Sequence, residues 1–282
     1  MNRLEIRKTY KLYIGGKFPR TESGRTYGLQ DRKGEVIANV CRGSRKDFRN
    51  AVVAARKAQP GWASATAYLK GQILYRIAEV LEGRSEQFVE ELKLQGVSLA
   101  AARKEVTAAI DLFVHYAGWS DKYQAVYSSV NPVAGAQFNF SRPESTGVVA
   151  VVAPEGSGLL GLASVIAPAI VGGNTVVVLA SEGKALSAIS FAEVLATSDV
   201  PGGVVNILTG HRDELLKQMA SHMDVNAMVL CSDDAEERKL VQLEAANNVK
   251  RVVLHEDAPL DLSPRHVMDL QEIKTTWHPV GI

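Results

Sequence analysis

The second half of the chain alternates short apolar runs with longer segments of helical periodicity. The apolar runs at residues 148–152, 175–179, 204–208, 227–230 and 251–254 predict buried strands. The segments at 159–171, 185–196, 213–221 and 235–246 predict the helices between them. Strands that alternate with such helices favour a parallel sheet with helices on both faces. We therefore predict an α/β fold built on a doubly wound, Rossmann-like sheet.

The first half of the chain predicts hairpins followed by helices. A hairpin at residues 10–18 turns at Gly15-Gly16, and a second pair of short strands spans residues 27–40. Helical periodicity predicts a helix from Asp47 to the Pro-Gly-Trp run at 60–62, and further helices at 69–82, 85–94 and 98–124. The apolar stripe of the last helix is expected to be Ile110, Phe113, Val114, Ala117 and Trp119.

Two segments fall outside both patterns. Residues 126–140 predict an extended hairpin with an irregular turn, and residues 272–277 predict a strand near the end of the chain. The late strand could pair with an earlier sheet edge of this chain or with the edge of another chain.

Composition and charge exclude several classes of protein. The 282 residues are 46% hydrophobic and 22% charged, and the net charge of +1 leaves no strongly basic face for nucleic acid. The apolar stretch at 159–179 is divided by Pro168 and a Gly-Gly-Asn run, so we expect no membrane span. The charged residues 1–10 do not resemble a signal peptide, and the two cysteines, Cys41 and Cys231, form no disulfide framework. We therefore expect a cytoplasmic location.

The carboxyl ends of the predicted parallel strands are the expected place for a ligand. The candidate nucleotide-binding positions there are Val152, Ala153, Pro154, Ser181, Glu182 and Gly210. Glu182 could accept a hydrogen bond from a ribose hydroxyl, whereas Gly210 is one glycine where a phosphate loop would use two. Arg212 is expected to be an exposed loop residue rather than a phosphate ligand.

Several motifs carry a family resemblance. Residues 173–182 (GNTVVVLASE) resemble the nucleotide-binding turn of aldehyde dehydrogenases, in which a strand ends in Lys-Pro-Ser-Glu. Ordered landmarks at 13–18 (YIGGKF), 34–38 (GEVIA), 60–62 (PGW), 198–210 (SDVPGGVVNILTG) and 221–225 (SHMDV) extend the resemblance. Residues 11–254 are similar to the N-terminal, nucleotide-binding half of this family. The nearest resemblance is to the non-catalytic second module of two-module aldehyde dehydrogenases.

The resemblance also identifies functional positions that have changed. Family members oxidise an aldehyde through a cysteine thiohemiacetal and transfer hydride to NAD(P), which requires a nucleophile, a base and an oxyanion donor. In this chain the family's oxyanion asparagine is Gly156, its general base falls on His255, and its cofactor lysine is Leu179. The nucleophile belongs to a catalytic domain that this chain is expected to lack. We therefore expect no catalytic residues and, at most, weak binding of NAD(P).

The resemblance implies a domain organisation. Residues 1–125 and 141–256 are expected to form the nucleotide-binding-type domain, and residues 126–140 with 266–282 an oligomerisation hairpin and C-terminal strand. An internal deletion of the catalytic domain would explain this order and would leave an apolar face open. The expected partners are a second copy of the chain or a full-length aldehyde dehydrogenase paralogue, with no nucleic acid and no membrane.

Three hypotheses follow. The first is a non-catalytic structural or regulatory subunit. The second is an oxidoreductase subunit that contributes to aldehyde oxidation in a hetero-oligomer, or a new chemistry that uses Cys231 and His255. The third is a nucleotide-binding sensor. Cys231 at a strand end is expected to be buried and inert, and the run His255-Glu256-Asp257 is not expected to bind a metal, because adjacent side chains of an extended segment point apart.

Overall fold

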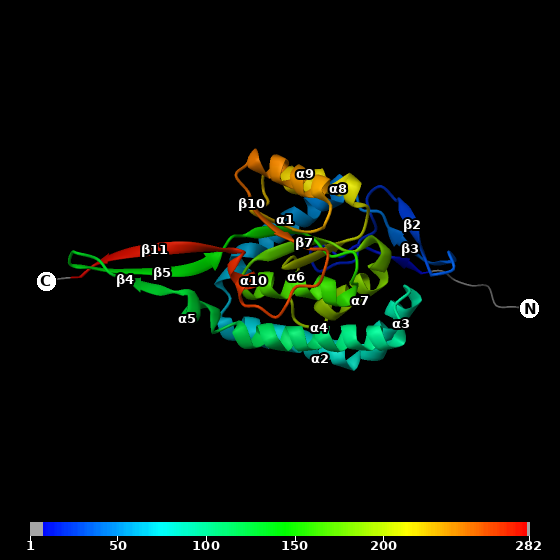
Figure 1. Ribbon diagram of the computed structural model, residues 1–282, viewed down its shortest axis with the longest axis horizontal. Coiled ribbons are helices and arrows are strands. Elements are labelled where there is room, and N and C mark those ends of the chain that lie inside the picture. Colours follow the sequence, from blue (N-terminus) through cyan, green and yellow to red (C-terminus); the bar gives the residue numbers. More distant parts are fainter. Residues whose placement is uncertain (1–7, 281–282) are drawn as a thin grey trace, which may run out of the picture.

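Five parallel strands form the centre of the protein (Figure 1). The computed structural model describes residues 8–280. In spatial order these are β10 (Arg251–His255), β9 (Ala227–Cys231), β6 (Val148–Val152), β7 (Thr175–Leu179) and β8 (Val205–Leu208). Every residue of β6, β7, β8 and β9 is buried, which explains why these strands read as continuous apolar runs. The predicted α/β fold with a parallel sheet is confirmed.

Helices cover both faces of this sheet (Figure 1). One face carries α1 (Arg45–Ser64), α8 (Arg212–Ser221) and α9 (Ala235–Ala246). The other carries α6 (Leu159–Val171) and α7 (Ala185–Ala196), backed by α2 (Ala67–Gly83), α3 (Ser85–Leu94) and α4 (Leu99–Trp119). Alternate residues of β6 supply the two cores, since Val148 and Val152 pack with α1 and α8 whereas Val149 and Val151 pack with α6.

The N-terminal strands form a small sheet of their own. It consists of β1 (Thr9–Tyr10), β3 (Val36–Cys41) and β2 (Thr26–Gln30), in that order. The predicted turn at Gly15-Gly16 is present, and the buried Asn206 side chain accepts a hydrogen bond from the Gly15 N–H at 2.9 Å. The Asn206 amide also donates to the carbonyl oxygens of Val176 and Gly203 at 3.1 and 2.9 Å. Asn206 therefore ties the N-terminal turn to the parallel sheet.

The predicted end of the first helix is wrong. Helix α1 begins after Ser44, which forms a capping box with Asp47, and it continues through Pro60 to Ser64. The last turn is held from outside the helix, because the indole N–H of Trp62 donates to the Ile170 carbonyl oxygen at 2.8 Å.

The prediction of one helix over residues 98–124 is also wrong. Helix α4 ends at Trp119, and a short break precedes α5 (Tyr123–Tyr127). The predicted stripe is displaced, since Leu112 and Tyr116 are buried while Val114 is 43% exposed. The displacement follows from packing, because α4 contacts α2 and α3 as well as α6 and therefore buries more than one stripe.

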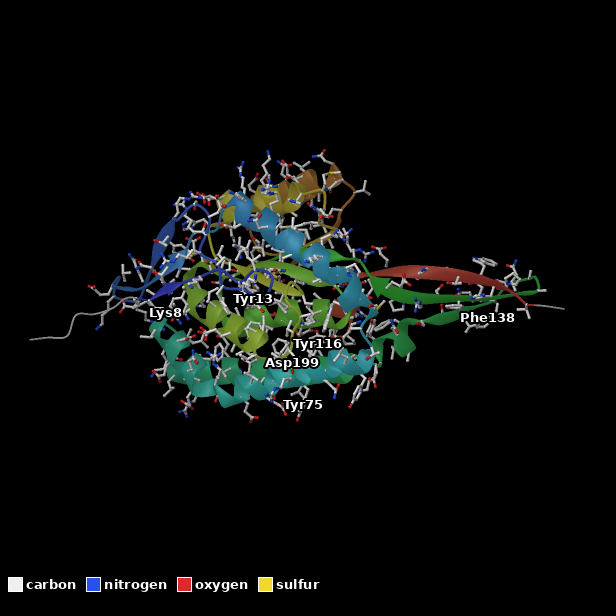
Figure 2. The ribbon with its side chains drawn as sticks, turned by 180° about the vertical axis from the view of Figure 1, so that it is seen from behind. Lys8, Tyr13, Tyr75, Tyr116, Phe138 and Asp199 are labelled. Carbon is white, nitrogen blue, oxygen red and sulfur yellow. The ribbon has the colours of Figure 1, made fainter. Side chains whose placement is uncertain are left out.

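A three-stranded antiparallel sheet projects from the body of the protein (Figure 1). Its order is β11 (Gln271–Pro279), β5 (Gln137–Ser145) and β4 (Ser129–Asn131). Strand β11 pairs with the whole of β5, so the late strand pairs within its own chain. Strand β5 runs beyond the predicted hairpin end at residue 140, and Phe138 lies near the far end of the sheet (Figure 2).

Residues 256–270, here called the linker segment, join β10 to β11 and include α10 (Arg265–Met268). Val267 and Leu270 are buried in the core of the α6 face, and the Tyr116 hydroxyl donates to the Ser263 carbonyl oxygen at 3.0 Å. The linker segment is therefore anchored to the α6 face of the protein. Within residues 8–280, no helix is long and apolar enough to cross a membrane.

Candidate functional site

The carboxyl edge of the parallel sheet carries a cleft of about 800 Å³. The chain runs from β6 outward to β7 and β8 and then returns to β9 on the other side of β6, so β6 and β9 flank the switch point where such sheets bind ligands. The cleft is lined by Arg42, Glu155, Glu182, Gly183, His211, Arg212, Asp213 and Glu237.

The six predicted nucleotide-binding positions gather at this edge but contribute little to the cleft. Among the described residues that line it, Glu182 is the only one of the six. Val152, Ala153 and Ser181 are buried in the sheet and its turns. Gly210 packs against Gly43, where a Cβ would lie 3.1 Å from the Gly43 nitrogen, so its close approach is to the protein's own backbone.

The side chain of Glu155, in the loop after β6, binds the turn after β7. Its Oε2 accepts hydrogen bonds from the Ser181 hydroxyl at 2.8 Å and from the Glu182 backbone N–H at 2.9 Å. Its Oε1 accepts from Nε of Arg212 at 2.9 Å. The predicted position Ser181 and the turn at Glu182 are therefore already engaged by a carboxylate of the same chain.

Arg212 is a bridging residue, and its predicted role as an exposed loop arginine is wrong. Its side chain is 15% exposed at the start of α8, and it donates to the Ala153 carbonyl oxygen at 2.7 Å. A third bond joins its Nη1 to Oε2 of Glu237 on α9 at 3.2 Å, and the same carboxylate oxygen accepts from Ser232 at 2.5 Å. Glu155, Arg212 and Glu237, here called the cleft network, thus connect the loops after β6, β8 and β9.

Glu182, the predicted ribose acceptor, has partners of its own. Its Oε1 lies 2.5 Å from Nδ1 of His211, and its backbone carbonyl accepts from the Tyr27 hydroxyl at 3.2 Å. Burial raises the pKa of Tyr27 well above its usual value, and the charge of Glu182 adds to this rise, so Tyr27 stays a neutral donor. A ribose hydroxyl would have to compete with His211 for the carboxylate.

Helix N-termini at the carboxyl edge could bind the phosphates of a nucleotide, because their free N–H groups attract anions. At α6, Oε1 of Glu105 accepts from the backbone N–H of Leu159 at 2.8 Å and of Leu160 at 3.2 Å. At α7, the N–H of Leu186 donates to Gln95 at 3.0 Å, and at α9 the Asp234 side chain caps the first turn. Side chains of the protein therefore occupy three of these anion sites.

The positions considered for catalysis have different surroundings in the structure. The N–H of Glu155, one residue before Gly156, donates to Asp257 at 2.6 Å. His255 ends β10 and lies edge-on to His266 of the linker segment, with ring centroids 5.4 Å apart. Cys231 is buried, and burial raises the pKa of its thiol to about 12, so it is not a thiolate at neutral pH.

The charges of the cleft oppose an anionic ligand. Four carboxylates line it, from Glu155, Glu182, Asp213 and Glu237, against two guanidinium groups. One of these, Arg42, is paired with Glu214, and the other is Arg212 of the cleft network. A pyrophosphate placed here would face more negative than positive charge.

The cleft network could hardly be predicted from the sequence. Glu155 and Arg212 are charged residues in the loops that follow predicted strands, which was the available signal. Arg212 is 57 residues from Glu155 and 25 residues from Glu237 along the chain. The pairing therefore depends on the topology of the sheet.

Comparisons with known proteins agree with this architecture. The profile of the aldehyde dehydrogenase family matches residues 20–257. Cytosolic 10-formyltetrahydrofolate dehydrogenase of Mus musculus is 30% identical over 260 residues, which are 90% of this chain and 29% of that protein. Aldehyde dehydrogenase family 2 member C4 of Arabidopsis thaliana is 32% identical over 255 residues, which are 89% of this chain and 50% of that protein.

A solved structure shows the same fold. The aldehyde dehydrogenase of Bacillus cereus in complex with NAD+ has a TM-score of 0.83 and 25% identity, over 88% of this chain and 50% of that one. This chain spans about half the length, or less, of these relatives. The matched part is the portion that contains the parallel sheet.

Proposed function

Because this chain belongs to the aldehyde dehydrogenase family, we propose that it is a non-catalytic subunit of that family, comparable to the second module of two-module members. It would assemble with itself or with a full-length NAD(P)-dependent aldehyde dehydrogenase. The observation that carries the proposal is the cleft network, in which Glu155 and Arg212 use the groups that a nucleotide would need. Gly156 at the oxyanion position supports it, since a glycine side chain donates no hydrogen bond.

The second hypothesis, an independent chemistry at Cys231, has less support. A thiol must ionise to attack a carbonyl, and burial raises the pKa of Cys231 to about 12. The other cysteine, Cys41, is also buried, at 1% exposure. Both thiols are buried, whereas reactive cysteines are open to solvent.

Assembly would use the projecting sheet. Strand β11 is an edge strand within the described residues, and one face of it presents Ile273 and Trp277, which are 55% and 59% exposed. Phe138 of β5 is 46% exposed and lies on the opposite face of the sheet, because it pairs with His278. An unpaired edge and exposed apolar side chains are features of surfaces that another chain covers.

A nucleotide-binding sensor is the second candidate, favoured by the NAD+ complex of the Bacillus cereus relative and by the retained cleft. It would require the cleft network to open on binding, so the free energy of breaking the Arg212 contacts would be subtracted from the affinity. Weak binding of NAD(P) is therefore the expectation.

Activity and assembly can be tested together on the full chain. We expect no NADH absorbance at 340 nm when the chain alone meets a panel of aldehydes with NAD+ or NADP+. Light scattering should give a defined oligomer, and in the double variant I273S/W277S this oligomer should dissociate. The matched control is V249S, because Val249 is 93% exposed on the body of the protein.

Aldehyde oxidation by the chain alone that disappears in the C231A variant would overturn the non-catalytic assignment. The assembly would be overturned by two results together. The chain would be a monomer at all concentrations, and it would alter neither the mass nor the activity of a full-length dehydrogenase from the same genome.

A further inference from the structure

Three potential metal ligands meet between β10 and the linker segment. One ligand atom from each of His255, His266 and Asp269 lies within 4.8 Å of the other two. His255 is the last residue of β10, whereas His266 belongs to α10 and Asp269 follows it directly. The three residues are partly buried, and the fold brings them together from two separate elements.

The two ring nitrogens of His266 differ in how they are engaged. Its Nε2 lies 2.6 Å from Oδ1 of Asp261. Its Nδ1 is buried and has no hydrogen bond of good geometry among residues 8–280, although Oδ2 of Asp269 lies 3.4 Å away. A buried polar atom without a partner is costly and calls for an explanation. A histidine that ligates a metal through one nitrogen and donates the other N–H to a carboxylate has this arrangement.

We propose that His255, His266 and Asp269 bind a divalent transition metal ion, for which zinc fits the donor set best. Two imidazoles and one carboxylate are typical zinc ligands, with bonds of about 2.0–2.2 Å. Tetrahedral geometry with such bonds separates the donor atoms by about 3.4 Å. The Nδ1–Oδ2 distance of 3.4 Å already matches, and a ring nitrogen of His255 lies within 4.8 Å of the other two donor atoms. Asp261 would orient His266 without touching the ion.

This site would link the parallel sheet to the projecting sheet. Its ligands lie on β10 and at the end of the linker segment, immediately before β11. Metal binding would therefore fasten the linker segment that carries Val267 and Leu270 into the core. The proposal is independent of the nucleotide cleft and of the assembly proposed above. It departs from the expectation of no metal site, because two of its ligands, His266 and Asp269, lie outside the adjacent run of residues 255–257.

A proton could serve instead of a metal ion. Asp269 and then Asp261 raise the pKa of His266, so an imidazolium between two carboxylates would also be satisfied. For His255, burial and the neighbouring His266 lower the pKa, which keeps this ring neutral and able to ligate. Zinc raises the melting temperature of the protein if the three residues bind the metal ion, but not if a protonated His266 satisfies the two carboxylates.

Calorimetric titration of ZnCl₂ into the chelator-treated full chain tests the proposal. We expect one zinc ion to bind per chain, and zinc at about a hundredfold over its Kd to raise the melting temperature by roughly 5 °C. The variants H266Q and D269N should lose at least tenfold in zinc affinity, and D261N should lose about tenfold through loss of orientation. The matched control H278Q removes an exposed histidine of β11 and should bind zinc like the native chain.

The melting temperature without metal shows whether each variant is folded. If H266Q is unfolded, D261N provides the test, because Asp261 is exposed and its replacement leaves every proposed ligand in place. No saturable binding below 1 mM zinc, on the order of the weakest affinity that would matter, would overturn the proposal. Binding that H266Q, D269N and D261N leave unchanged would also overturn it, as would a pH-dependent melting temperature that zinc does not alter.

Discussion

Replacement of Arg212 by alanine is expected to destabilise the protein by about 2–3 kcal/mol. The variant loses three bonds, to Glu155 at 2.9 Å, to Ala153 at 2.7 Å and to Glu237 at 3.2 Å. A hydrogen bond to a charged group contributes about 1.5–3 kcal/mol when buried. The total for the three bonds is reduced by contact with solvent, because the side chains of Arg212 and Glu155 are 15% and 31% exposed.

The change in the free energy of unfolding can be measured by urea denaturation. The loss corresponds to a fall in melting temperature of about 4–10 °C for a chain of this size. The matched control is R25A, because Arg25 pairs with Glu214 at a site where its own side chain is 46% exposed. This control should cost less than about 1 kcal/mol. An equal loss in R212A and R25A would refute the idea that the cleft network holds the loops together.

A double-mutant cycle separates the ion pair from other effects of removing the arginine. The variant E155Q keeps an acceptor for Ser181 but removes the negative charge opposite Arg212. The interaction energy between R212A and E155Q should be about 1 kcal/mol or more, as is usual for contacting residues of one network. Additive losses would show that Glu155 and Arg212 act independently.

Three further predictions concern the scaffold and its thiols. The variant N206A should lose about 2–4 kcal/mol, because three hydrogen bonds of a fully buried amide disappear; a loss below 1 kcal/mol in urea unfolding would contradict this. The variant G203A should lose about 2 kcal/mol or more, since Gly203 has a φ of 98° and a Cβ there would lie 2.6 Å from the Ala54 carbonyl oxygen; an unchanged melting temperature would be the contrary result. Cys41 and Cys231 should react with a thiol reagent at pH 8 only after unfolding, because both are buried and the pKa of Cys231 is raised to about 12; rapid labelling of the native chain would disprove it.

The helices and strands of the second half could be predicted almost residue by residue. The bounds of β6, α6, β7, α7 and α9 agree with those predicted, because continuous apolar runs are separated there by glycine and polar turns. The end of α1 could not be predicted, since it depends on the bond from Trp62 to Ile170 rather than on local sequence.

The candidate site was less accessible to prediction. Sequence alone located the carboxyl edge and the turn at Glu182, because strand ends are visible as the ends of apolar runs. The role of Arg212 depends on carboxylates that only the parallel topology brings close, and the same holds for the contact of His255 with His266. Pairing between charges far apart in the chain leaves no local pattern in the sequence.

The proposed loss of nucleotide binding follows from side chains of the protein that already engage groups at the carboxyl edge of the sheet. Its most direct test is the melting temperature of the full chain in the presence of 1 mM NAD+, since a ligand that binds only the folded state must raise stability. A dissociation constant of 10 mM or weaker would add less than about 0.1 kcal/mol, so we predict no measurable shift. A dissociation constant near 10 µM would add about 2.7 kcal/mol, and the resulting rise of several degrees would contradict the account.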